Sequence, residues 1–349
     1  MSNSTGEVTA PSSGIDRVAQ LQLDMMKAAG AADRRGQHPK QHGCVCAEFK
    51  VLADIPDRYK VGLFAQPKTY KAFIRFSSGK EANDTKADIH GMAIKLIGVE
   101  GTKVLDAEAS AETHDFILAD HPVFFIRDTK EYVLFTEDLA RITPTTPKEE
   151  RLAKFFGWLK ENRLADMPAV LGFVNGHVQD SPLTTQYWSQ VPYEFGNGTG
   201  TICRYSATPH PGNFMVPPIA LGERDADYLR RVMATLLAGA PARFDFNVQV
   251  RDGATPEVID NPTVTWSTPI QRVAEITIRP QPFDSPEQMR FGENLSYTPW
   301  HALPDHSPVG QVNEIRKTVY VESSKLRHGS TGAPRTEPTE SDYERFKPA

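Results

Sequence analysis

Seven short segments alternate apolar and polar residues with the two-residue period of a β-strand, and this pattern constrains the fold most strongly. Val45, Ala47 and Phe49, for example, alternate with Cys46 and Glu48. The segments are residues 44–51, 71–78, 90–97, 114–118, 201–206, 244–250 and 273–279. They lack the regular helical crossovers that a parallel sheet requires. The sequence therefore predicts an α+β chain built on an antiparallel sheet or barrel.

Four other segments repeat apolar residues with helical spacing, and they are predicted to be helices added to the sheet. These are residues 18–28, 147–159, 226–238 and 312–327. We predict a single domain over residues 15–327, with a disordered lead at 1–14 and a polar tail at 328–349. The tail has no apolar periodicity, so both ends are expected to be mobile or wrapped on a partner subunit.

Charge and hydropathy exclude several classes of partner. The 349 residues carry a formal net charge of −5, which gives no general attraction for nucleic acid. No apolar run approaches the roughly 20 residues of a membrane span, and the N-terminus has no secretory pattern. We therefore predict a cytoplasmic protein with no membrane span and no nucleic-acid partner. Cys44, Cys46 and Cys203 are predicted to be buried thiols rather than disulfide or zinc ligands.

Two histidines beside the first predicted strand are candidates for acid-base chemistry. His38 and His42 are four residues apart, and spacing alone does not decide between a catalytic and a structural role for either. Arg75 and Ser77 lie on one face of the predicted strand 71–78. If that face points inward, the arginine needs an anionic partner, which is either a protein carboxylate or the acid group of a ligand.

Aromatic and histidine residues further along the chain extend the set of candidates. Phe124 and Phe125 could form the wall of a site for a flat ligand, or could pack in the core. Tyr297 has packing as its ordinary role, but a tyrosine phenolate is also one of the few protein ligands of haem iron. His301 and His306 are a rival pair that could hold a metal ion, although their spacing is not a standard ligand pattern.

Five motifs, in order along the chain, resemble those of the catalase superfamily, in particular its small catalase-related haem proteins. Residues 35–40 (RGQHPK) are similar to R-x-x-H-A-K, 74–78 (IRFSS) to V-R-F-S-T, and 88–95 (DIHGMAIK) to D-P-R-G-F-A-V-K. Residues 122–128 (PVFFIRD) are similar to P-I-F-F-I-R-D, and 295–297 (LSY) to F-S-Y. The resemblance covers about residues 34 to 327. It implies an antiparallel eight-stranded β-barrel of catalase type with added helices, binding haem b.

The resemblance also implies roles for individual residues. Tyr297 would be the proximal ligand of the haem iron, and His38 the distal histidine, with His42 left as the competing assignment. Arg35 and Arg75 would pair with the haem propionates. In addition, Ser77 would hold the distal histidine, and Phe124 or Phe125 would pack near the porphyrin.

Two positions depart from the family pattern. Arg290 is the remaining candidate arginine for contact with the cofactor, but it is almost two helical turns before Tyr297, roughly 10 Å along a helix axis. One turn before its proximal tyrosine the family has an arginine, whereas this chain has Glu293 at that position. A carboxylate there would disfavour the phenolate. The family's distal asparagine is replaced by Ala119 or Asp120, and the carboxylate of Asp120 could act as an acid-base partner or cap a turn.

The function implied by the resemblance is that of a haem-dependent oxidoreductase that activates a peroxide. The distal histidine would take the proton of a hydroperoxide and return it to the departing oxygen, which is an acid-base contribution of about 10²- to 10⁴-fold. The departures favour a peroxidase, or an enzyme acting on an organic hydroperoxide as allene oxide synthases do, over efficient catalase activity. The alternative, favoured by Glu293, is a non-catalytic haem-binding relic. The resemblance further implies a homo-oligomer.

Overall fold

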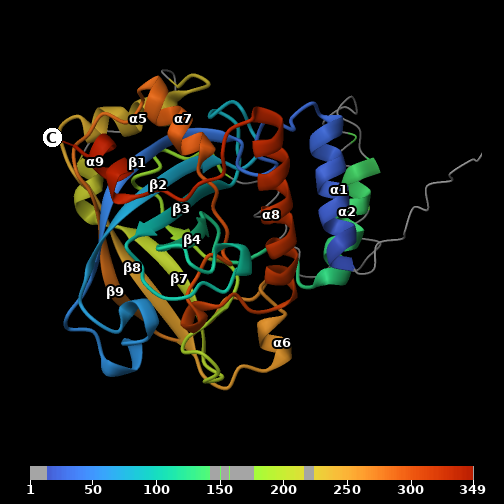
Figure 1. The fold of residues 1–349 in the computed structure, drawn as a ribbon, viewed down its shortest axis with the longest axis horizontal. Helices are drawn as coiled ribbons and strands as arrows, with labels where there is room; N and C mark the ends of the chain where they lie inside the picture. The colour runs from blue at the N-terminus through green and yellow to red at the C-terminus, as the bar shows by residue number, and fades with distance from the viewer. Residues whose placement is uncertain (1–13, 142–149, 151–156, 158–176, 216–223, 349) are drawn as a thin grey trace, which may run out of the picture.

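The strands of the computed structural model, which describes residues 14–141, 150, 157, 177–215 and 224–348, form one antiparallel barrel (Figure 1). The strands are β1 Lys40–Val51, β2 Thr69–Ser78, β3 His90–Ile97, β4 Thr113–Ala119, β5 Tyr187–Trp188, β6 Tyr193–Glu194, β7 Ile202–Pro209, β8 Ala242–Arg251 and β9 Ile270–Ile278. Their order is β5-β4-β3-β2-β1-β9-β8-β7-β6, and β5 also pairs with β7. That second pairing closes a ring of eight strands, with β6 beside β7. The predicted eight-stranded antiparallel barrel is therefore confirmed.

The inside of the barrel is packed with aromatic rings. Phe116 lies at the centre of this packing, with its ring centroid 4.8 Å from that of Phe246, 5.0 Å from that of Tyr205 and 6.0 Å from that of Phe49. All four side chains belong to one large apolar cluster of the described residues. The interior is thus a solid core, so any sizeable ligand site on these strands has to lie outside the barrel wall.

Strand alternation gives β2 and β3 two different faces. Ile74 and Phe76 on β2 pack in the barrel core, whereas Phe73 belongs to a second apolar cluster outside the wall, together with Tyr297. Arg75 and Ser77 share the outer face with Phe73, because residues two apart in a strand point to the same side. On β3 the partners of these two residues are Ala93 and Gly91.

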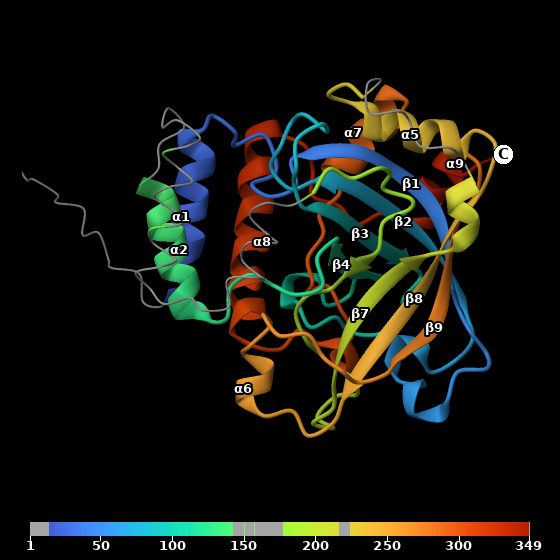
Figure 2. The same ribbon diagram turned by 180° about the vertical axis from the view of Figure 1, so that it is seen from behind.

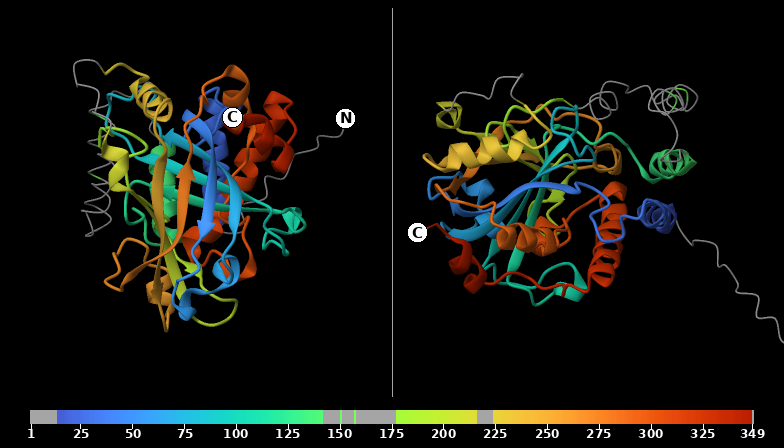
Figure 3. Two further views of the ribbon diagram at one scale, coloured as in Figure 1. Left: turned by 90° about the vertical axis from the view of Figure 1, so that its left-hand side faces the viewer. Right: turned by 90° about the horizontal axis from the view of Figure 1, so that it is seen from above.

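The helices lie around the barrel. They are α1 Gly14–Ala28, α2 Thr129–Arg141, α5 Tyr228–Leu237, α6 Pro256–Ile259, α7 Pro286–Asn294, α8 Gln311–Thr331 and α9 Glu340–Phe346. Single 3-10 turns occur at Asp57–Tyr59, Gly62–Phe64, Asp106–Glu108, Pro211–Met215 and Pro304–His306. Helix α8 runs alongside the barrel, and α1 and α2 lie beyond it (Figures 1 and 2). The view from above in Figure 3 shows the same layering.

Helix α8 therefore has two neighbours. Val18 and Ala19 of α1 pack with Ile315 and Val319 of α8 in a small apolar cluster. The predicted helices near 18–28, 226–238 and 312–327 correspond to α1, α5 and α8. The helix predicted at 147–159 falls outside the residues that the structure describes, apart from two isolated positions.

The C-terminal segment differs from the unpacked polar tail that we expected. Helix α8 continues to Thr331, and α9 then packs the side chains of Tyr343 and Phe346 on the outer apolar cluster. A reciprocal capping box between Thr339 and Asp342 starts α9. Two apolar residues on about two turns are too few to produce a periodic signal, which is why the pattern did not predict this helix. The extent of the single domain, residues 15–327, stays a prediction.

Two smaller predictions can be compared with the structure. Cys44, Cys46 and Cys203 are buried and free, as predicted. Among the described residues, every helix is too short or too polar to cross a lipid bilayer.

Candidate functional site

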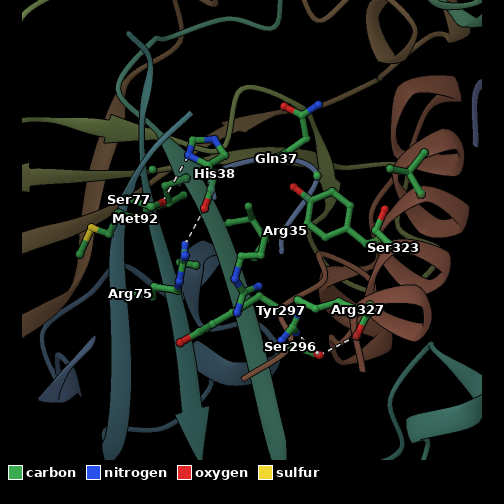
Figure 4. A pocket seen from close by; sticks show the side chains of 18 residues that line it. Arg35, Gln37, His38, Arg75, Ser77, Met92, Ser296, Tyr297, Ser323 and Arg327 are labelled. Atoms are coloured by element: carbon green, nitrogen blue, oxygen red, sulfur yellow. Dashed lines mark hydrogen bonds between the residues drawn. The ribbon is translucent and has the colours of Figure 1, made fainter. Parts of the chain in front are cut away.

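A pocket lies against the outer face of β2, β3 and β4, with the segment before β1 and helix α8 as its other walls (Figure 4). Its empty space is about 760 Å³, a volume that includes solvent at its open mouth. Its polar lining residues are Arg35, Gln37, His38, Arg75, Ser77, Ser296, Tyr297, Tyr320, Ser323, Ser324 and Arg327, and its apolar ones include Met92, Ala93, Ile117, Leu118 and Val319. Figure 4 shows His38 and Ser77 at one end, and Ser296, Tyr297 and Arg327 toward the other, with Arg35 and Arg75 between them.

His38 is fixed in the pocket through its backbone and its ring. Its φ of 54° is in the left-handed region, which a non-glycine residue adopts only when its surroundings hold it there. Its N–H donates to the carbonyl of Gly79 at 2.9 Å, and its own carbonyl accepts from Nη1 of Arg75 at 3.1 Å. The ring nitrogen Nδ1 lies 3.3 Å from Oγ of Ser77. Burial lowers the pKa of His38 to about 4, so the ring is neutral near pH 7.

Gly91 on β3 leaves the space that the imidazole of His38 occupies. A Cβ atom at this position would lie 2.7 Å from Nδ1 of His38 and 3.0 Å from Oγ of Ser77. Any larger residue here would push the histidine away from the serine. The absence of a side chain at position 91 is therefore part of the geometry of the site.

Three arginines give the pocket its positive charge. Nη2 of Arg75 lies 3.1 Å from Oε2 of Glu293, and Nε of Arg35 lies 3.5 Å from Oε1 of the same carboxylate. Arg327 donates to the carbonyls of Glu293 at 2.7 Å and Leu295 at 3.3 Å. Burial, reinforced by the neighbouring Arg75, lowers the pKa of Arg35 to about 9. One carboxylate thus faces several cations, which favours the binding of a further anionic group.

Arg327 is the site residue that the sequence prediction missed. It lies on α8, where Tyr320, Ser323, Ser324 and Arg327 all line the pocket. Their spacing is i, i+3, i+4 and i+7, which places them on one face of a helix. This polar stripe beside the apolar face of a predicted helix was the signal that could have revealed it.

Tyr297 follows α7 and lies under the pocket with its hydroxyl buried. The phenolic oxygen has no hydrogen-bond partner among the described residues. The guanidinium of Arg35 lies 5.9 Å from the ring centroid, and Nζ of Lys95 lies 5.5 Å from it. Burial raises the pKa of the phenol well above its usual value, with Cys44 adding to the effect and Arg35 opposing it. A buried polar atom without a partner is uncommon in proteins, and it marks Tyr297 as a residue that a ligand could engage.

Five of the predicted site residues thus lie in this pocket: Arg35, His38, Arg75, Ser77 and Tyr297. The other five, His42, Asp120, Phe124, Phe125 and Arg290, are absent from the described residues that line it. The structure therefore does not bring the whole predicted set together.

His42 and Asp120 lie on the far side of the strands. A register shift between Gln41 and Gly43 in β1 turns His42 away from the pocket, and its Nε2 lies 2.9 Å from Oγ of Ser78. Asp120 follows β4 and is bonded to His90. Neither residue faces the space into which His38 points.

The two phenylalanines and Arg290 are also separate from the pocket. The ring centroids of Phe124 and Phe125 are 4.8 Å apart, and Phe125 also packs on Phe135 of α2 at 5.1 Å. Their placement therefore matches core packing, the other reading of this pair. Arg290 is exposed on α7.

The rival metal pair, His301 with His306, is not formed either. Nδ1 of His301 is bonded to Glu108, and its Nε2 to Thr113. His306 instead lies between Oη of Tyr205, 2.9 Å from its Nδ1, and the backbone N–H of Leu63, 3.0 Å from its Nε2. The two imidazoles are thus hydrogen-bonded at different places.

Comparison with known proteins agrees with the barrel and with the order of the motifs. The family model described as Catalase matches residues 31–304. The chain belongs to the catalase family. A catalase-related peroxidase of Mycolicibacterium paratuberculosis (strain ATCC BAA-968 / K-10) is 27% identical over 267 residues, which cover 75% of this chain and 79% of the relative.

Solved catalases share the fold. A fungal catalase matches with a TM-score of 0.66 and 20% identity over 90% of this chain and 63% of its own. Catalase A of Saccharomyces cerevisiae matches with a TM-score of 0.62 and 19% identity over 84% of this chain and 61% of its own. This catalase-family chain thus spans about three fifths of the length of these solved catalases.

The residues of the pocket fit the haem that the family implies. The orphaned phenolic oxygen of Tyr297 is of the chemical type that binds haem iron. Arg35, Arg75 and Arg327 supply guanidinium groups of the kind that pair with carboxylates, as Arg35 and Arg75 already do with Glu293. The apolar lining supplies the surroundings that a porphyrin needs.

Proposed function

We propose that this catalase-family protein is a haem-dependent oxidoreductase that activates a peroxide, acting as a peroxidase or on an organic hydroperoxide, with weak catalase activity at most. The observation that carries the proposal is the arrangement of one pocket. His38, held by Ser77, lies at one end, and the orphaned phenol of Tyr297 lies toward the other. The catalase-related peroxidase of M. paratuberculosis supports the same class of reaction.

The protein would hold the haem through residues of the outer wall. Tyr297 would provide the ligand to iron, and Arg35, Arg75 and Arg327 would pair with the propionates. Bound haem would supply the redox chemistry of the reaction. Burial raises the pKa of the phenol, so Tyr297 carries its proton until iron binds. On binding, it would lose that proton, and the nearby Arg35 and Arg75 would stabilise the resulting negative charge.

His38 would move the proton of the substrate. Its pKa of about 4 keeps the ring neutral at pH 7. If Nδ1–H donates to Ser77, Nε2 carries the lone pair that accepts the proton of a hydroperoxide. The same nitrogen would then return the proton to the departing oxygen, so that it leaves as water or an alcohol. Apolar side chains such as Ala93, Ile117 and Val319 give an organic hydroperoxide a surface to pack on.

The test combines substrate turnover with haem content. Protein expressed with a supply of haem is assayed with hydrogen peroxide and with alkyl and fatty-acid hydroperoxides, and the His38→Ala variant is assayed in the same way. We expect turnover of at least one organic hydroperoxide, and a loss of turnover in His38→Ala while haem stays bound. Unchanged turnover in that variant would contradict the role of His38.

The non-catalytic haem-binding relic is a second candidate because of Glu293. Its carboxylate already engages two of the arginines, Arg35 and Arg75, and therefore competes with the propionates for them. A ferric haem spectrum that shifts with cyanide, without turnover of any hydroperoxide, would favour the relic. We favour the enzyme because the histidine and its serine partner are placed in the same pocket.

A further inference from the structure

A second cluster of chemically active side chains lies on the inner side of β3, at the mouth of the barrel. His90 has the strand parity of Met92 and Ile94, which pack in the barrel core. Oδ2 of Asp120 lies 2.7 Å from Nδ1 of His90 and 3.4 Å from Nε2 of His177. Two imidazole nitrogens thus converge on one carboxylate oxygen.

The backbone holds the three residues in place. The other oxygen of Asp120, Oδ1, accepts the backbone N–H of His90 at 2.7 Å, and this bond fixes the orientation of the carboxylate. His177 forms a two-way backbone bridge with Asp88, with N···O distances of 3.1 and 3.2 Å. His90 is the first residue of β3, and Asp120 directly follows β4. The cluster is therefore preorganised by three separate parts of the chain.

Asp120 has no permanent cation beside it. Its side chain is fully buried, and among the described residues only His90 and His177 approach it within ion-pair distance. A second group of possible metal ligands, Glu108, His301 and Glu337, is different, because Arg335 pairs with Glu108 and Lys95 pairs with Glu337 at 2.6 Å. Those carboxylates are already neutralised by arginine and lysine, whereas the charge of Asp120 is not.

Two ring nitrogens in the same region are also without partners. Nε2 of His90 and Nδ1 of His42 are buried and have no hydrogen bond to any described residue. The ring centroids of these histidines are 6.4 Å apart, and those of His90 and His177 are 5.6 Å apart. These two nitrogens differ from the three atoms that converge at Asp120, because it is Nδ1 of His90 that lies against the carboxylate.

We propose that Nδ1 of His90, Oδ2 of Asp120 and Nε2 of His177 bind a divalent first-row transition-metal ion such as Zn²⁺. Two imidazoles and one carboxylate are a common ligand set for these ions, with bonds of about 2.0–2.2 Å. In a tetrahedral site such bonds place neighbouring ligand atoms about 3.4 Å apart. His177 and Asp120 have this separation already.

Binding requires one small adjustment. His90 and Asp120 have to separate by several tenths of an ångström, and the proton of their hydrogen bond is released to solvent as the ion takes its place. The side chain of His177 is 49% exposed, so the ion has a route from solvent, and water can fill a remaining coordination position. The proposed haem pocket lies against the other face of β3, although Asp120 and His90 still act electrostatically on His38.

Calorimetric titration of the full-length protein with Zn²⁺, after dialysis against a chelator, tests the site. The two test variants are His177→Ala and Asp120→Asn. His177 is half-exposed, so its removal leaves the core intact, and asparagine keeps the shape of the aspartate. His210→Ala is the matched control, because it also removes one histidine and lies at an exposed position of the chain. Circular dichroism establishes that each variant is folded.

We expect one Zn²⁺ to bind per chain, and each test variant to weaken binding at least about 100-fold, while His210→Ala leaves it unchanged. Zn²⁺ should also raise the melting temperature of the wild type and not that of His177→Ala. No saturable binding to the wild type would overturn the proposal. Equal affinity in either test variant would overturn it as well, since the ion would then be held elsewhere.

Discussion

The outer and inner faces of the same strands carry two different kinds of chemistry. On the outer face, Ser77 and Gly91 adjoin His38 in a pocket with arginines and a phenol. On the inner face, the adjacent residues Ser78 and His90 belong to a cluster of histidines and carboxylates at the mouth of the barrel. A shift of one residue along a strand therefore moves a side chain from one site to the other.

The two histidines near the start of β1 show the same division. His38 precedes the strand and is bonded to Ser77, whereas His42 lies within it and is bonded to Ser78. The irregularity between Gln41 and Gly43 sets the orientation of His42. The two imidazoles are chemically identical, so their roles are distinguished by the strand face on which each one lies.

The largest expected effect separates these two histidines. His38→Ala should lower the rate constant for reaction with a hydroperoxide by about 10²- to 10⁴-fold, because the acid-base group is lost. His42→Ala should leave the rate per bound haem close to that of the wild type, and should instead destabilise the fold by about 1–3 kcal/mol, since it leaves the hydroxyl of Ser78 without its partner. Stopped-flow kinetics and thermal unfolding measure the two effects. A loss of rate in His42→Ala with none in His38→Ala would reverse the assignment.

The next largest effect is expected at Gly91, which lies against the ring of His38. Gly91→Ala should lower the rate by about 10- to 100-fold, because the added methyl group displaces the His38 ring, and small misplacements of a catalytic group cost rates of this order. The neighbouring atoms are side-chain atoms that can move, so the fold should survive. Ser77→Ala provides the comparison, since it removes the contact to His38 without adding a clash. A rate in Gly91→Ala equal to that of the wild type would show that His38 does not work from this position.

A smaller effect should distinguish two adjacent serines. Ser77→Ala removes one long hydrogen bond to His38, which is worth about 0.5–1.5 kcal/mol, so the rate should fall by about 2- to 10-fold. Ser78→Ala, which touches His42 instead, is the matched control and should keep the rate. The same kinetic assay applies to both. Equal losses in the two variants would mean that the faces of β2 do not separate the sites.

The pH dependence should show the smallest effect over the neutral range. Because the pKa of His38 is lowered to about 4, its ring is neutral at every pH above that value. The rate should therefore change little between about pH 8 and pH 5, and should fall as the ring takes up a proton near pH 4. A rate profile measured on protein that remains folded at each pH checks this. A fall in rate centred near pH 6.5, the ordinary pKa of histidine, would contradict this prediction, because the acid-base group would then be a solvent-exposed imidazole.

Much of the fold could be predicted from sequence because β3, for example, alternates cleanly and its predicted limits, 90–97, match those observed. Strands β5 and β6 were not predicted, since two residues each are too few for a period. The motifs located Arg35, Arg75 and Tyr297, which the structure brings to one pocket.

The rest of the site depends on contacts between distant segments. The orientation of His42 follows from a bulge, which the residue pattern does not specify. Arg327 reaches the pocket only because α8 packs beside the outer face of the barrel. Asp120 was placed near the distal pocket by its position in a motif, whereas its parity turns it to the inner face with His90.

The ultraviolet-visible spectrum of protein expressed with haem, with a pyridine-haemochrome assay of the haem content, tests the central claim most directly. The comparison is with Tyr297→Phe, which removes only the orphaned hydroxyl. The account predicts about one haem per chain in the wild type. It also predicts a ferric spectrum that changes, or a haem that is lost, in the variant. A wild-type protein without haem, or a variant with an unchanged spectrum, would contradict it.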